Sequence, residues 1–181
     1  MRTVIAILLT LLPHISRAGE PDPMHEFFVT ERESGALLLN TGLAAGVLGA
    51  ALRVQDSQIA QGASYAVFAV ALVEIGAGIL LMNSHARERK SVAARERAPI
   101  AFAASERVRM KRIDLQYKLV EIFEGLVMAS GVTLAGVGGA SHRDMLAGAG
   151  LGLILQGGVL LTLDLNAHRH ARRYQATLAR D

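Results

Sequence analysis

Two polar side chains interrupt long apolar stretches, where they are costly unless they meet each other or water. Glu74 lies near the middle of one stretch, and Gln156 lies at nearly the corresponding depth of another. An ionisable group inside hydrocarbon normally faces protein or a water-filled cavity, and a protonated carboxyl group can hydrogen-bond an amide. The pair therefore predicts either a proton or cation site between two helices or a neutral hydrogen bond that fixes helix register.

A second group of titratable side chains lies near the ends of two later apolar stretches. Glu121 and Glu124 are three positions apart, and Asp164 and His168 are four apart, so each pair shares one helix face. Such carboxylates and imidazoles can bind a divalent ion in a helical bundle. The Glu-x-x-His pairs of di-iron proteins are missing, however, and we predict no metal ion. The simpler interpretation is pairing with arginines at the membrane surface, the candidates being Arg87, Arg112 and Arg169.

Motifs of conventional catalysis are missing from the sequence. It contains no phosphate-binding glycine loop, no His-Glu-x-x-His and no Gly-x-Ser-x-Gly. The glycine-rich run from Gly148 to Gly152 lies inside an apolar stretch without a preceding strand, which is not a nucleotide-binding context. Cysteine is absent, so disulfides and thiolate metal sites are excluded. We therefore expect no enzymatic activity and no cofactor.

Four apolar, glycine-rich stretches must position these side chains, at residues 35–52, 63–82, 119–137 and 146–165. Each is close to the ~20 residues that a helix needs to cross the ~30 Å hydrocarbon core of a bilayer. Hydrophobic residues make up 51% of the chain and Trp is absent, which is unlike an ordinary soluble domain. The sequence therefore predicts an all-α integral membrane bundle of four transmembrane helices, arranged as two hairpins.

The N-terminus is typical of a signal peptide. Arg2 precedes a short apolar run at residues 4–12, and Ser16 and Ala18 fit cleavage after Ala18. The run is too short to span a membrane. The segments expected along the chain are a signal peptide (1–18), a polar N-terminal segment that becomes helical only near the membrane (19–34), a first transmembrane hairpin (35–82), a basic helical linker (83–118), a second transmembrane hairpin (119–166) and a basic C-terminal tail (167–181).

The linker is predicted to form two helical extensions of the spans. One continues the second span through Asn83 to about Arg97, where Pro99 stops it, because the residue before proline disfavours the helical region. The other begins near Ser105, which can cap a helix N-terminus, and runs into the third span.

Two rules disagree about the side of the membrane on which the linker lies. A cleaved signal peptide would place the mature N-terminus outside the cytoplasm, and four crossings would leave the linker outside as well. The linker holds ten basic residues, whereas the short loops around Arg53 and Arg143 hold one each, and this charge bias indicates a cytoplasmic linker. Four spans cannot satisfy both rules.

Basic side chains near the helix ends are candidates for contact with lipid or a partner. These are Arg87, Arg89, Lys90, Arg109, Lys111 and Arg112. The net charge is only +3, and the basic residues crowd beside apolar helix ends. Anionic membrane lipid is therefore the expected counter-charge, and nucleic acid is not an expected partner.

Small residues form two packing motifs, Gly42-x-x-x-Gly46 and Gly148-x-x-x-Gly152. Such faces let helices approach closely where lipid supplies no hydrophobic drive for association. They serve either self-association into a homo-oligomer, or contact with another membrane protein, or packing within one bundle.

An internal repeat relates the two hairpins. Superposing Gly42 on Gly125, and Asn83 on Asn166, gives both halves the same order of span, short polar loop, span and basic segment. Two spans per half make the repeat parallel, which disfavours the inverted-repeat transporter folds.

The C-terminal quarter resembles a set of small bacterial membrane proteins of unknown function that have a signal-like N-terminus and four spans. The resemblance rests on Gln156-Gly157 and on Asp164 at the membrane edge of the last helix, after the glycines at 148, 150 and 152. An aromatic residue commonly precedes the Asp in that set, where this chain has Leu163. The rest of the chain matches only in plan. The resemblance implies a bacterial envelope membrane protein and supplies no activity.

These observations predict a non-enzymatic interaction or scaffold component of a bacterial inner membrane, with the basic linker as its docking surface. The alternative is a small transporter or proton-coupled subunit that uses Glu74, Gln156 and the linker-side carboxylates. A further alternative is a soluble periplasmic bundle in which the apolar stretches are core helices.

Overall fold

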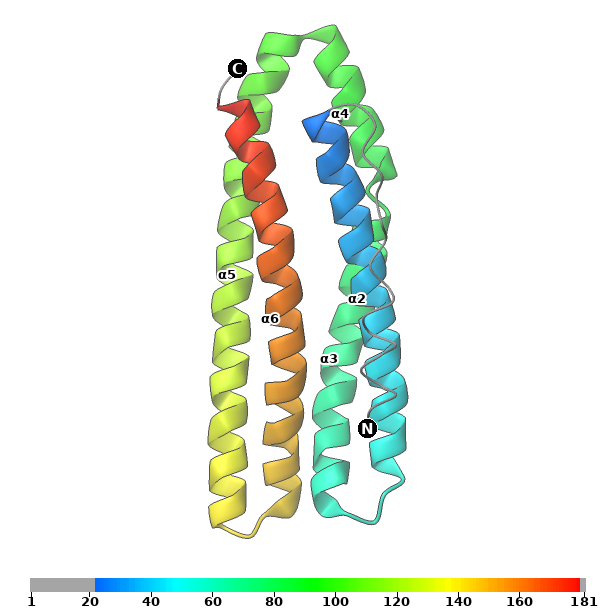
Figure 1. Ribbon diagram of the computed structural model, residues 1–181, viewed down its shortest axis with the longest axis vertical. Helices are drawn as coiled ribbons and strands as arrows, with labels where there is room; N and C mark the ends of the chain where they lie inside the picture. The colour runs from blue at the N-terminus through cyan, green and yellow to red at the C-terminus, as the bar shows by residue number, and fades with distance from the viewer. Residues whose placement is uncertain (1–21, 180–181) are drawn as a thin grey trace.

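The structure is a computed structural model that describes residues 22–179, and these residues form helices and no strand (Figure 1). The helices are α2 (Pro23–Arg53), α3 (Gln58–Met82), α4 (His85–Arg97), α5 (Pro99–Ala140) and α6 (Asp144–Leu178). The predicted signal peptide at 1–18 lies outside the described residues. The all-α prediction is confirmed. Four helical segments are long and apolar enough to cross a membrane, which indicates a multi-pass membrane protein.

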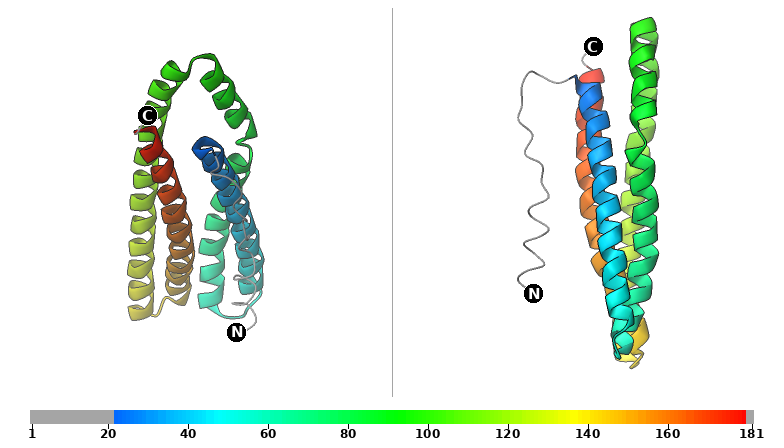
Figure 2. Two further views of the ribbon diagram at one scale, coloured as in Figure 1. Left: turned by 45° about the horizontal axis from the view of Figure 1, so that its top comes forward. Right: turned by 90° about the vertical axis from the view of Figure 1, so that its right-hand side faces the viewer.

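Two antiparallel hairpins, α2–α3 and α5–α6, stand side by side (Figure 1). Their short loops lie at one end, which we call the loop end, and the linker arches over the other (Figure 2). The second helices of the hairpins, α3 and α6, form the main contact between them. The apolar span of α5 packs mainly on α6, and it is the least buried of the four.

Glycines bring α3 and α6 into backbone contact at the loop end. A Cβ atom added to Gly62 would stand 1.9 Å from the carbonyl oxygen of Met145, and one on Gly148 would stand 1.9 Å from that of Ile59. Superposing Ile59 and Gly62 on Met145 and Gly148 turns each of these contacts into the other. A two-fold axis therefore relates the two hairpins. The parallel repeat is therefore present in space.

The register of that repeat differs from the one predicted. Gly42 packs on Ala71 of its own hairpin, and the matching contact of the other hairpin joins Met128 to Gly157. Gly42 therefore corresponds to Met128 and not to Gly125. The prediction was wrong because the two halves differ in length between the short loop and the basic segment, and the sequence comparison matched the basic segments.

The linker is helical as predicted, with two differences at its boundaries. A turn at Asn83 and Ser84 separates α4 from α3, although the sequence predicted one continuous helix. The helix α4 ends at Arg97 as expected, but α5 begins at Pro99 and not near Ser105. Proline suits the first turn of a helix because the backbone N–H that it lacks would have no partner there. Ser105 is not a cap, and its hydroxyl instead donates to the carbonyl of Phe102 within α5.

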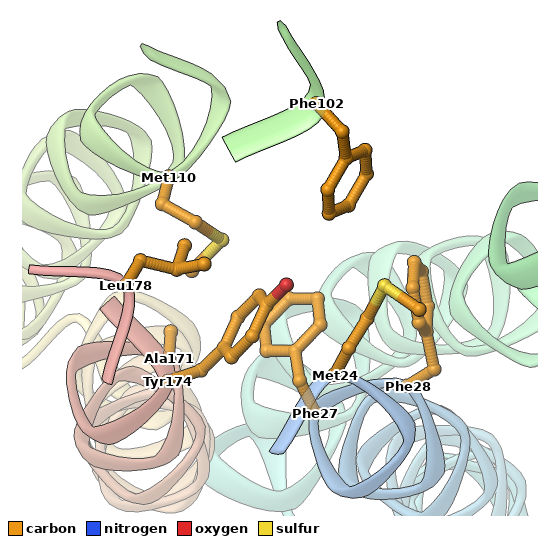
Figure 3. Packing of buried hydrophobic residues seen from close by; sticks show 8 residues of the cluster. All are labelled: Met24, Phe27, Phe28, Phe102, Met110, Ala171, Tyr174 and Leu178. Atoms are coloured by element: carbon orange, nitrogen blue, oxygen red, sulfur yellow. The ribbon is translucent and has the colours of Figure 1, made fainter. Parts of the chain in front are cut away.

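An aromatic core holds together the linker end of the molecule, which we call the head and define as residues 22–34, 84–118 and 167–179. Its buried members are Met24, Phe27, Phe28, Phe102, Met110, Ala171, Tyr174 and Leu178 (Figure 3). The rings of Phe27 and Tyr174 stack with centroids 5.2 Å apart, which joins α2 to α6. The N-terminal segment is therefore helical from Pro23 onward, rather than only near the membrane, because its aromatic face is buried here.

Ion pairs attach the basic linker to the acidic start of α2. The guanidinium of Arg95 donates to both carboxylate oxygens of Asp22, at 3.0 and 2.6 Å, and Arg87 lies 3.1 Å from Glu31. The hydrogen bond from Arg95 lowers the pKa of the Asp22 carboxyl group. Burial raises the pKa of Glu31 against the opposing pull of Arg87. The linker is thus fixed on α2 and is not a free tether.

Candidate functional site

The predicted contact between Glu74 and Gln156 is present. The amide Nε2 of Gln156 donates to Oε1 of Glu74 at 2.8 Å, and the two residues are 5% and 0% exposed. The pair joins α3 to α6, and Gly42 of α2 packs directly on the Cβ atom of Glu74. The second oxygen, Oε2 of Glu74, is buried without a hydrogen-bond partner. The hydrogen bond to Gln156 therefore satisfies only one of the two oxygens of this buried carboxyl group, and an unsatisfied buried oxygen is costly.

At the linker side, His168 of α6 lies between two carboxylates of α5. Its Nδ1 is 2.5 Å from Glu121, and its Nε2 is 2.8 Å from Asp114. The ring of Tyr117 stacks on the imidazole with centroids 5.1 Å apart. Each ring nitrogen therefore faces a carboxylate oxygen of α5, and Nε2 also lies 3.1 Å from the guanidinium of Arg172.

Asp114 contacts two basic side chains in addition to His168. Lys118 lies 2.5 Å from one of its oxygens and Arg172 3.1 Å from the other. The hydrogen bond from Lys118, and next that from His168, hold the pKa of the Asp114 carboxyl group well below its ordinary value. Asp114 therefore stays ionised at neutral pH and balances the cations around it.

The carboxyl groups of Glu124 and Asp164 meet between these two levels. They face each other across α5 and α6, and Oε2 of Glu124 is buried without a hydrogen-bond partner. Two carboxylates this close repel each other when both are ionised, and a proton on one of them relieves the repulsion. The pair is therefore a place where a proton can be held.

Together these groups form what we call the polar column, which runs from the head toward the middle of the bundle. Its members are Glu74, Asp114, Glu121, Glu124, Gln156, Asp164 and His168. Asp164 lies eight positions after Gln156 on α6, or about 12 Å along the axis. The sequence predicted the two ends of the column separately, and the packing of α5 on α6 aligns them.

The contacts of the polar column differ from the predicted surface pairing. Within residues 22–179, no group of three or more His, Asp or Glu side chains is placed to hold a metal ion. The predicted pairing of the column carboxylates with Arg112 and Arg169 is wrong, because Asp114 and Glu121 instead contact His168. The predicted partner Arg87 pairs with Glu31.

Three of the four predicted packing glycines lie in contacts within the chain. Gly42 faces α3, while Gly148 and Gly152 face α3 from α6. Gly46 has no atom within 4 Å of an added Cβ. Packing within one bundle therefore accounts for these glycines, with the exception of Gly46.

The basic candidates for lipid or partner contact divide into two groups. Arg109 is half-buried, donates to Glu106 and lies 5.5 Å over the rings of Phe27 and Phe28, so it holds the head together. Arg87 pairs with Glu31. The remaining four are exposed on α4 and α5, namely Arg89, Lys90, Lys111 and Arg112.

Sequence reasoning missed the aromatic core of the head. The signal was available, because Met24, Phe27 and Phe28 have helical spacing in an otherwise polar segment. Their partner Tyr174 lies in a tail that composition marks only as basic. The hydroxyl of Tyr174 donates to the buried Glu106 at 3.1 Å, so this core also satisfies a buried carboxylate.

Comparison of the chain with protein-family models, with curated proteins and with solved structures finds no match.

Proposed function

We propose that this protein is a multi-pass component of a bacterial inner membrane that acts as a non-enzymatic scaffold, with the head as its docking surface for another protein. The resemblance of the last span to bacterial envelope proteins supports this location. The observation that carries the proposal is the outer face of α5 in the head.

That face exposes large apolar side chains among basic ones. Ile100, Val108 and Leu115 are 88%, 62% and 56% exposed and follow one another along the helix. Exposed Lys111 and Arg112 lie beside them. Large apolar side chains that stay exposed on one helix face, outside any core, mark contact surfaces.

Lipid tails do not reach the start of this face, at Ile100, if α5 crosses a membrane. The helix has 42 residues, which corresponds to about 63 Å, roughly twice the ~30 Å hydrocarbon core. Ile100 precedes the apolar stretch at 119–137 by 19 positions, or about 28 Å of helix. A partner that offers apolar side chains and carboxylates matches the chemistry of this face.

Site-specific photocrosslinking tests the docking surface. A benzophenone amino acid placed at Val108 should give a crosslinked product with a defined partner in intact cells. The same probe at Ala86, which is exposed on α4 of the head and not on α5, is the matched control and should not. Equal products from both positions, or none from Val108, would overturn the scaffold proposal.

Location and orientation are tested separately from docking. An inner-membrane protein should resist carbonate extraction and sediment with inner-membrane vesicles. Because the chain has no cysteine, a single Ser91→Cys substitution can report the side of the linker with a membrane-impermeant maleimide. Labelling in cells with only the outer membrane opened places the linker outside the cytoplasm. Protection until the inner membrane is opened places it inside.

A second candidate function is favoured by the polar column. The orphan oxygen of buried Glu74 and the contact between Glu124 and Asp164 are suited to carry protons between the head and the middle of the bundle. In this alternative, Glu74→Gln abolishes pH-driven proton uptake by proteoliposomes, while Thr162→Ser, a conservative change on α6, does not. A scaffold shows no uptake in any variant and keeps its crosslinks in Glu74→Gln.

A further inference from the structure

A groove opens between α3 and α6 at the loop end, opposite the head. It has a volume of about 410 Å³ and is lined by Gly62, Tyr65, Arg143, Met145, Leu146 and Ala149. The size falls in the lower range of small-molecule sites, about 300–1,000 Å³. All lining side chains except Arg143 and the tyrosine hydroxyl are apolar, so the groove is an apolar trough with a cationic end.

The backbone of the α5–α6 turn fixes the arginine at that end. His142 adopts a φ of 53°, the left-handed conformation that closes a helix C-terminus. The N–H of Arg143 then donates to the carbonyl of Gly138 at 2.8 Å. The turn therefore places Arg143 directly before α6, where its side chain lines the groove.

A second arginine, from the other hairpin, contacts the tyrosine on the wall of the groove. The guanidinium of Arg53, the last residue of α2, lies 4.8 Å from the ring centroid of Tyr65. The carboxylates of Asp56 and Asp144 are close in the sequence, but neither arginine forms an ion pair with a carboxylate in the part of the chain that the structure describes. Two guanidinium groups thus have charge available for an anion.

The two-fold relation between the hairpins supplies an internal comparison. Superposing Ile59 on Met145 places Ser57 on Arg143 and Tyr65 on Leu151. The opposite side of the α3–α6 contact therefore has a serine at the turn and a leucine on the wall. The arginine and the tyrosine are found on one side only, so they are not a general consequence of the hairpin design.

We infer that this groove binds an anionic phospholipid, with an acyl chain along the apolar trough and the phosphate at Arg143 and Arg53. The planar guanidinium forms paired hydrogen bonds to phosphate oxygens. Tyrosine is favoured at the level of the lipid headgroups, and Tyr65 is half-exposed on the wall. The inference requires that the chain spans a membrane, but it does not depend on the scaffold role of the head.

Native mass spectrometry of the purified full chain in detergent tests the site. Phosphatidylglycerol should remain bound at detergent levels that remove phosphatidylcholine. Arg143→Ser, which copies the residue at the equivalent position, should weaken retention of phosphatidylglycerol by about tenfold or more, the effect expected for a charge-assisted pair. Tyr65→Leu copies the equivalent wall and should weaken retention less.

The controls distinguish lipid binding at this groove from non-specific attraction to basic residues and from unfolding of the variant. Arg112→Ser removes an exposed arginine of the head and should leave retention unchanged. Arg143→Lys keeps the charge without the planar fork and should be intermediate, and circular dichroism of each variant reports helix content. Equal retention of phosphatidylglycerol by Arg143→Ser and wild type overturns the inference. Displacement of the lipid by millimolar inorganic phosphate also overturns it, because the trough would then contribute nothing.

Discussion

Gln156 donates a 2.8 Å hydrogen bond to Glu74, and this contact joins the two hairpins at a depth where both side chains are buried. One oxygen of Glu74 is satisfied and the other is not. The contact is therefore sensitive to changes that remove the amide and tolerant of changes that preserve it.

Gln156→Leu should destabilise the bundle by about 1–3 kcal/mol, because it leaves the buried Glu74 carboxyl group without any partner. Glu74→Gln keeps the shape of the side chain and one hydrogen bond, so it should cost less than about 1 kcal/mol. Unfolding of the detergent-solubilised protein by SDS, followed by circular dichroism, measures both. A larger loss in Glu74→Gln than in Gln156→Leu would contradict this account of the contact.

Gly148→Ala should separate the hairpins at the loop end. Its new Cβ would stand 1.9 Å from the backbone oxygen of Ile59, which no side-chain rotation can relieve, and overpacking of this kind costs about 1–3 kcal/mol. Gly136→Ala is the matched control, because no atom lies within 4 Å of its Cβ. The control should be neutral or stabilising by up to about 1 kcal/mol, since alanine is the better helix former. Equal thermal unfolding of the two variants would refute the close contact.

Phe28→Ala should loosen the head and leave the spans intact. Phe28 is fully buried in the aromatic core, and truncation of such a side chain costs about 3–5 kcal/mol. Limited trypsin digestion measures the effect, because the exposed arginines of α4 and α5 become cleavable when the head opens. Phe123→Ala, at an exposed position of α5, should leave the digestion pattern unchanged.

Acid should weaken the attachment of α4 to α2 through Asp22. The hydrogen bond from Arg95 lowers the pKa of Asp22 from its ordinary value of 3.8. The pair therefore stabilises the fold above pH 3.8, and this contribution is lost as the pH falls through the folded-state value. Both side chains are more than a third exposed, so solvent limits the contribution to about 0.2–1 kcal/mol.

Asp22→Asn isolates that contribution. It keeps a cap for the backbone N–H of Met24 and removes the charge. The difference in thermal midpoint between wild type and variant should be largest near neutral pH and shrink toward pH 2. Glu31 acts in the opposite sense, because burial raises its pKa and its contribution is lost as the pH rises. A difference that grows on acidification would show that Asp22 is not the group responsible.

Local patterns in the sequence determined the helices, the two hairpins and the polar groups within them. Apolar stretches of membrane length, interrupted by short polar loops, can satisfy their backbone hydrogen bonds only as helices. Glu74 and Gln156 could be paired in advance because each lies alone at mid-depth of an apolar stretch. The helices, the hairpins and the positions of their polar groups depend on residues that are close in the sequence, so they can be read from the sequence alone.

Only the tertiary structure decided which faces meet. The contact of His168 with Asp114 and Glu121 replaced the predicted pairing with Arg112 and Arg169. The rotation of α5 against α6 that allows it is set by glycines such as Gly150, which packs on Ala135. The head core likewise joins Phe27 to Tyr174, residues at opposite ends of the chain. Contacts between distant segments depend on the sum of many weak packing energies. A local sequence pattern does not contain this information, so it could not predict these contacts.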